Sequence, residues 1–158
     1  MTEVDRILDQ MKRAFSGDAW HGEAIGKLLV GITAEQAATR PIENAHSVRG
    51  IVLHITAWER AVRRRLDGAR AELAAEENWP SGDRTDEQAW EREKASLSGV
   101  HEELKRAVAQ LADAQFDEPI LPGMSSVYVT LHGIIQHSLY HAGQIAILRK
   151  AFAEDEPR

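Results

Sequence analysis

Apolar residues recur along most of this chain at spacings of three and four, and the strict alternation typical of β-strands is almost absent. The pattern therefore predicts an all-α fold. A first helix is expected over residues 2–16, and a second apolar stretch follows at about 22–30. Thr33 with Gln36 three residues later forms a capping-box pattern, which predicts a short helical turn in a connecting region.

Three more helices follow, each opened by a residue type that caps helix N-termini. Ser47 is expected to cap a long helix over 47–66, which ends before a glycine. Thr85 opens a second capping-box pattern and a helix over 85–111. A serine at 125 or 126 is expected to cap the last helix, which runs to about residue 152. Four long helices joined by loops predict a four-helix bundle.

The length of 158 residues fits one domain, which we place at 1–153, with 154–158 as a frayed C-terminal tail. The N-terminus lacks the layout of a signal peptide, and no stretch approaches the roughly 18 apolar residues that a membrane span needs. We therefore expect a soluble, cytoplasmic protein without a membrane partner.

The formal net charge of -6 provides no overall positive field to attract phosphate backbones, so nucleic acid is not an expected partner. The one basic cluster, Arg63–Arg65, falls late in a predicted helix, where cations complement the helix dipole, and we interpret it as a solvated face. The chain contains no cysteine, so any thiol that takes part in its chemistry must come from another molecule.

Two of the seven histidines, His137 and His141, lie four residues apart in the last predicted helix, so both rings project from one face. Such a pair alone is weak evidence, because this spacing arises by chance on many helices. The zincin pattern would place a glutamate after the first histidine, but Ser138 stands there. A metalloprotease is therefore not expected.

Helical geometry places His137 and His141 on one edge of an apolar stripe, and Gln144 shares that edge. His54 flanks the apolar stripe of the 47–66 helix on the side that carries Trp58. The three imidazoles can converge on one metal ion and leave coordination positions free for water or substrate. In the competing interpretation, His54 is a half-buried residue bonded to a backbone carbonyl. Imidazole ligands suit zinc, nickel, copper, cobalt or ferrous iron.

The other four histidines are expected to lie elsewhere. His132 points about 140° away from its neighbour at 137 on the helical wheel. His46 directly precedes a helix cap and is interpreted as a surface or capping contact. His101 stands in a charged stretch and is expected to be solvated. His21 falls at a break in the first helical region, from which it can line a pocket at the bundle mouth.

Five segments of the chain resemble the DinB-like superfamily, which also includes the YfiT-type proteins that have been suggested to be hydrolases. The segments that carry this resemblance are 20–22 (Trp-His-Gly), 45–48 (Ala-His-Ser-Val), 53–59 (Leu-His-Ile-Thr-Ala-Trp-Glu), 78–80 (Asn-Trp-Pro) and 131–145 around the histidine pair. The resemblance implies an up-down-down-up helix order and frequent homodimers. It also implies a divalent metal, zinc or nickel among others, held by His54, His137 and His141.

The resemblance further implies a transferase or isomerase that uses a low-molecular-weight thiol. The leading hypothesis is thus a metal-dependent enzyme of the thiol-dependent transferase type that acts on a small molecule, with bacillithiol, mycothiol or glutathione as cosubstrate. The alternatives are a hydrolase that uses metal-bound water, or a non-catalytic metal-binding or structural bundle. Iron, cobalt, manganese and copper remain compatible metals.

Four residues are candidates for supporting roles around the metal. His21, Glu59 and Tyr140 are candidates for general acid-base catalysis. Tyr140 lies at least about 80° from the ligand edge on the helical wheel. Gln144 is a candidate for orienting a ligand through a hydrogen bond.

Overall fold

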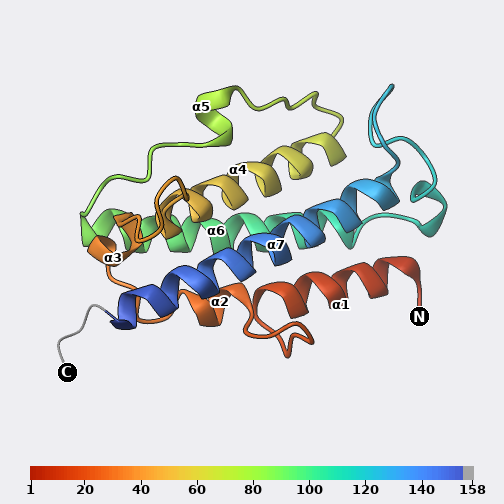
Figure 1. The fold of residues 1–158 in the computed structure, drawn as a ribbon. Coiled ribbons are helices and arrows are strands. Elements are labelled where there is room, and N and C mark those ends of the chain that lie inside the picture. Colours follow the sequence, from red (N-terminus) through yellow and green to blue (C-terminus); the bar gives the residue numbers. More distant parts are fainter. Residues whose placement is uncertain (155–158) are drawn as a thin grey trace.

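A computed structural model describes residues 1–154 and shows an all-α protein in which that part of the chain contains no β-strand (Figure 1). Four long helices form the body: α1 (Glu3–Phe15), α4 (Val48–Leu66), α6 (Glu87–Val108) and α7 (Val127–Glu154). Short helical segments lie between them, namely α2 (Ile25–Leu28), α3 (Ala34–Ala38), α5 (Ala75–Asn78) and the 3-10 turn η1 (Asp113–Gln115). The predicted all-α class is confirmed. The last helix continues to Glu154, and 155–158 of the predicted tail lie outside the described residues.

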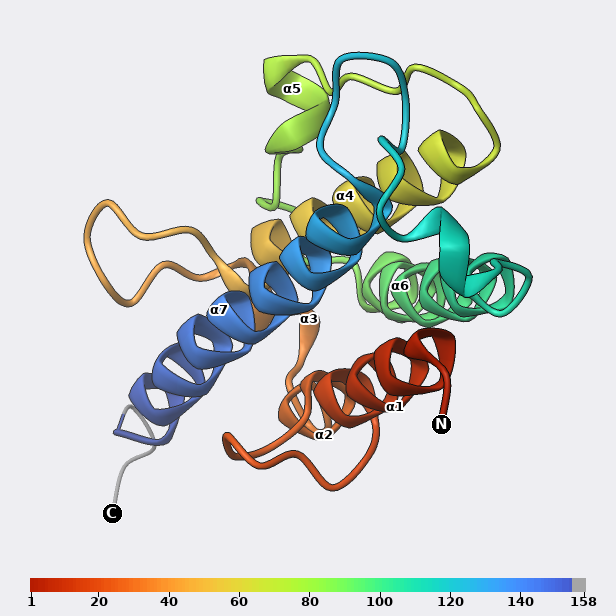
Figure 2. The same cartoon turned by 90° about the vertical axis from the view of Figure 1, so that its right-hand side faces the viewer.

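The four long helices run in the predicted up-down-down-up order. In Figure 1, α1 and α7 run in one direction along the bundle, and α4 and α6 run in the other. α4 packs against both α6 and α7, and α1 packs against the same two helices from the other side. The end-on view in Figure 2 shows the same arrangement. As a result, α4 and α7 are antiparallel neighbours that share a long interface.

Most predicted helix starts are confirmed at the level of hydrogen bonds. Thr33 and Gln36 form the predicted capping box, Ser47 Oγ accepts from the amide of Gly50, and Ser126 Oγ accepts from the amide of Val129. The amide hydrogens of a first helical turn have no partner inside the helix, so these side chains satisfy them.

Two predicted helix boundaries were wrong, both of them in the third long helix. The third long helix begins at Glu87 and not at Thr85, because the carboxylate of Asp86 caps it by accepting from two backbone amides. It ends at Val108 and not near 111. The apolar stretch over 22–30 forms a single helical turn, α2, and the turn-rich region before Pro80 contains the unpredicted helix α5.

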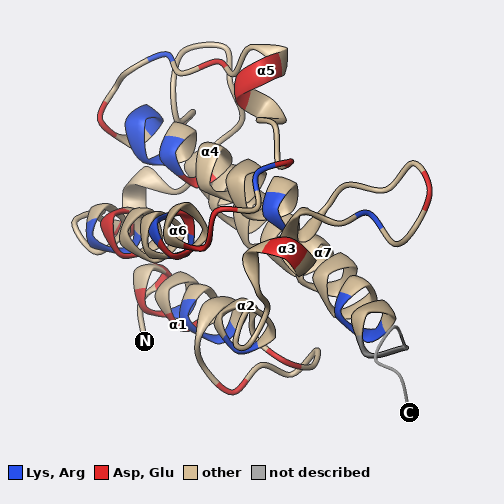
Figure 3. Cartoon of the chain, turned by 90° about the vertical axis from the view of Figure 1, so that its left-hand side faces the viewer, with Lys and Arg blue, Asp and Glu red and all other residues tan. Residues whose placement is uncertain are grey.

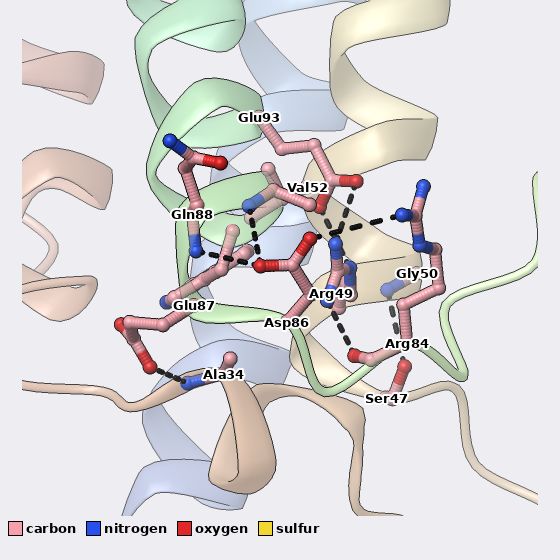
Figure 4. A network of polar contacts seen from close by, with 12 residues as sticks. Ala34, Ser47, Arg49, Gly50, Val52, Arg84, Asp86, Glu87, Gln88 and Glu93 are labelled. Atoms are coloured by element: carbon pink, nitrogen blue, oxygen red, sulfur yellow. Dashed lines mark hydrogen bonds and ion pairs between the residues drawn. The ribbon is translucent and has the colours of Figure 1, made fainter.

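A buried polar network fixes the start of α4 against the start of α6 (Figure 4). The guanidinium of Arg49, which is fully buried, pairs with the carboxylate of Glu93 through two nitrogens at 2.7 and 2.8 Å. A third nitrogen of Arg49 donates to the carbonyl of Arg84. Gly82 lies so close to α4 that an added Cβ would come within 2.6 Å of the amide nitrogen of Gly50. The loop before α6 is therefore held tightly to α4.

Basic residues occupy the last turn of α4, as Figure 3 shows, at the negative end of the helix dipole. The interpretation of the whole cluster as solvated was incomplete, because Arg65 donates to the carbonyl of Ala71 through two nitrogens. Arg63 pairs with Asp67. Within residues 1–154, no helix is long and apolar enough to cross a membrane.

A buried Glu59–His101 pair separates the two apolar clusters of the core. The carboxylate oxygens of Glu59 lie 3.1 and 3.2 Å from Nδ1 of His101, and both side chains are at most 4% exposed. The ring of Phe15 stacks on His101 with centroids 4.1 Å apart. The prediction that His101 is solvated was therefore wrong. Its local sequence is charged, but its face of α6 points at α4, where Glu59 supplies a hydrogen-bond partner.

Removal of Glu59 should destabilise the fold because it leaves a buried histidine without its partner. We expect Glu59→Ala to lower the free energy of unfolding by about 3 kcal/mol. Glu103→Ala, which changes an exposed glutamate on α6, should change it by less than about 0.5 kcal/mol. Urea denaturation followed by circular dichroism measures both. Equal small losses would show that the buried pair contributes no net stability.

Candidate metal centre

Three histidine side chains meet where α4 and α7 pack together. His54 comes from α4, and His137 and His141 come from consecutive turns of α7. Nε2 of His137 lies 2.9 Å from Nε2 of His54 and 3.2 Å from Nε2 of His141. One ring nitrogen from each residue lies within 4.8 Å of the other two. The predicted convergence of these three imidazoles is confirmed.

Hydrogen bonds on the outer side of the cluster set the orientation of two of the rings. Nδ1 of His54 donates to the backbone carbonyl of Asn78 at 2.5 Å, since a carbonyl oxygen can only accept. Nδ1 of His141 donates to Oε1 of Gln144 at 2.6 Å. With Nδ1 protonated, a neutral ring carries its lone pair on Nε2, so both lone pairs are available to the shared space.

The surroundings favour the neutral form of all three histidines. Burial, together with repulsion from the like charges of the neighbouring His141 and His54, lowers the pKa of His137 to about 4. Burial is also the main cause that lowers the pKa of His54 and of His141. A neutral imidazole is the form that binds a metal ion, so the cluster is ready for coordination near pH 7.

Trp79 covers the α4 side of the cluster. Its indole lies parallel to the ring of His54, with centroids 3.7 Å apart, and His46 stacks on the opposite face of the indole at 3.5 Å. The carboxamide oxygen of Asn78 accepts from Nε1 of Trp58 at 2.7 Å. The segment that ends α5 therefore holds the ring of His54 by a hydrogen bond and by stacking at once.

Sequence reasoning missed this role of the segment around Trp79. The stretch was interpreted as a run of turn formers, and His46 as a surface or capping contact. His46 is exposed, as expected for a surface contact, and it forms the outer layer of the stack. The available signal was the position of Asn78, Trp79 and Pro80 among the segments that carry the family resemblance.

The supporting candidates lie in different places. Gln144 contacts the cluster directly through His141. The ring of Tyr140 lies 5.2 Å from that of His141, but its side chain is 67% exposed. Glu59 faces His101 across the bundle, and His21 is exposed between α1 and α2. His132, as predicted, lies away from the cluster, 3.7 Å from the carboxylate of Glu3.

The donor set fits a divalent ion. Two nitrogens bound to one tetrahedral ion at about 2.1 Å lie roughly 3.4 Å apart. Nε2 of His137 lies at a similar distance from Nε2 of His54 and of His141, and all three nitrogens lie within 4.8 Å of one another. Three imidazoles from two helices also match the way bundles build metal sites from facing side chains. The hydrogen bonds to Asn78 and Gln144 correspond to the outer contacts that fix metal-binding histidines.

A cavity of about 320 Å³ opens beside His137 in the groove between α4 and α7. Its apolar lining includes Trp58, Val62, Val129 and Ile134. This volume is at the lower end of the range for small-molecule sites. A ligand in the cavity would lie next to one of the three histidines.

Comparison with known protein families identifies the family of this chain. The sequence model of the DinB superfamily matches residues 19–145, a span that includes all three clustered histidines and the segment around Trp79. Searches of curated proteins and of solved structures returned no significant match. Since the matched span covers most of the chain, this protein belongs to the DinB superfamily.

Proposed function

We propose that His54, His137 and His141 bind one divalent metal ion and that the protein is a metal-dependent enzyme acting on a small molecule. The main support for the proposal is the convergence of three Nε2 atoms, together with the hydrogen bonds that engage Nδ1 of His54 and of His141 elsewhere. Three protein ligands leave positions open for exchange, as in catalytic rather than structural zinc sites. A divalent ion in such a site acts as a Lewis acid that lowers the pKa of a bound water or thiol.

Within this proposal we favour a thiol-dependent transferase. The chain has no cysteine, so a thiol nucleophile would come from a cosubstrate such as bacillithiol, mycothiol or glutathione. The family resemblance implies the same class of reaction. The predicted metal, zinc or nickel, and the predicted homodimer belong to this proposal as well.

The protein's own residues would contribute position rather than covalent chemistry. Asn78 and Gln144 keep the rings of His54 and His141 turned so that Nε2 faces inward. Trp79 shields one side of the cluster from water by stacking on His54. The groove beside His137 leaves the opposite approach open to a substrate.

A thiol-transfer assay tests the reaction class. Protein loaded with zinc or nickel is incubated with each of the three thiols and the electrophile 1-chloro-2,4-dinitrobenzene, and thioether formation is measured by absorbance. We expect turnover that requires metal and thiol together and that His137→Ala abolishes. Metal-dependent hydrolysis of p-nitrophenyl acetate without any thiol would favour the hydrolase. No turnover in either assay, with metal bound, would favour a non-catalytic bundle.

Substitution of one histidine should separate the cluster from the other histidines. His137→Ala should weaken nickel binding by at least about 100-fold, because two imidazoles and a water replace three imidazoles. His132→Ala, a change in the same helix outside the cluster, should leave the affinity unchanged. Isothermal titration calorimetry measures both. Equal effects of the two substitutions would argue against a site at the cluster.

The pH dependence of nickel binding follows from the lowered pKa values. Because all three histidines are mostly neutral at pH 7, protons compete weakly there, and the apparent affinity should change less than about twofold from pH 8 to pH 7. The affinity should then fall as the pH is lowered from about 6 to 4, because the imidazoles become protonated. A tenfold loss already between pH 8 and 7 would be inconsistent with the buried, neutral cluster.

A further inference from the structure

The groove beside His137 contains a cation that the metal site does not use. Arg65 lines the cavity at α4 together with Trp58 and Val62, whereas α7 supplies the facing wall. The guanidinium carbon of Arg65 lies 5.6 Å from the centre of the Trp58 ring, over its face. The Trp58 ring in turn lies 6.1 Å from the ring of His137. The indole thus stands between the cation and the histidine cluster.

Arg65 is held in place but keeps donors to spare. Its Nε and one Nη both donate to the carbonyl of Ala71, which uses two of the five N–H groups of a guanidinium. In the part of the chain that the structure describes, no carboxylate forms an ion pair with it. By contrast, Arg63, two residues earlier in the same helix, is paired with Asp67. An oriented guanidinium with free donors suits a carboxylate in particular, because the two groups match in shape.

We propose that the groove binds a small carboxylate with an apolar body, whose anionic group pairs with Arg65 while its other end faces the histidine cluster. This proposal rests on the proposed function, since it names the substrate class of the same site. The apolar side chains of Trp58, Val129 and Ile134 contact the body of the ligand. Arg65 is therefore a specificity-determining residue, and it takes no part in the reaction itself.

Phenylacetate and its neutral isostere phenylacetamide serve as probes, since they differ in charge and hardly in shape. Binding is measured by saturation-transfer NMR titration on metal-free and on zinc-loaded protein at pH 7. We expect phenylacetate to bind about tenfold more tightly than the amide in both forms. Arg65→Gln should remove this preference, and Arg65→Lys should retain part of it. Arg60→Gln, at an exposed arginine of the same helix, should leave it unchanged.

A second variant tests the groove without removing the hydrogen bonds between Arg65 and Ala71. Gly133 lines the groove, and a Cβ added there would meet no atom within 4 Å, so Gly133→Leu fills the cavity without disturbing the core. It should abolish binding of both probes. Gly99→Leu is the matched control, because Gly99 lies in α6 with equally open space and outside this groove. Melting curves of all variants check that each one folds.

The outcomes separate this proposal from the metal site. Arg65-dependent preference for phenylacetate without any metal binding would support the groove and sink the metal proposal. Metal binding without any preference for phenylacetate would overturn the role of Arg65. A preference that needs zinc and survives Arg65→Gln would also overturn it, because the carboxylate would then bind the metal. Glutathione is titrated in parallel. If it binds in an Arg65-dependent way and phenylacetate does not, the groove holds the thiol, and the proposal is wrong.

Discussion

The close approach of three imidazoles between α4 and α7 is the constraint on which the rest of the site depends. Burial disfavours protonation of all three rings in this partly buried space, and repulsion from its neighbours adds to the effect at His137. Neutral rings must still satisfy their Nδ1 hydrogens, and two of them do so on Asn78 and Gln144. As a result, the Nε2 lone pairs of His54 and His141 face Nε2 of His137, an arrangement that a shared cation would stabilise.

Contacts elsewhere in the fold hold α4 in the position from which His54 faces α7. The buried pair of Arg49 and Glu93 fixes the first turn of α4 against α6. The segment at the end of α5 places Asn78 and Trp79 against His54. Deeper in the bundle, the hydrogen bond between Glu59 and His101 links α4 to α6 a second time. α4 is thus held on one side by polar contacts with α6 while its other side presents His54 to α7.

Periodicity and spacing predicted the parts of this arrangement that lie within single helices. The edge positions of His54, His137 and His141 follow from the rotation of 100° per residue in an α-helix. The same rotation excludes His132 from the cluster. His101 could not be placed in this way, because its partner lies 42 residues earlier in another helix and its neighbours in sequence are charged. The stack of His46, Trp79 and His54 depends on the path of a loop, which no helical period describes. Arg65 was assigned to a solvated cluster because its partner, the carbonyl of Ala71, also lies in a loop whose path the helical period does not predict.

Elemental analysis of the purified protein shows whether the histidine cluster is a metal site. After reconstitution with zinc or nickel and removal of free metal by gel filtration, we expect about one ion per chain. A variant with His54, His137 and His141 all changed to alanine should retain none. Less than about a tenth of an equivalent in the unmodified protein, or equal metal in the triple variant, would show that these three histidines are not a metal site.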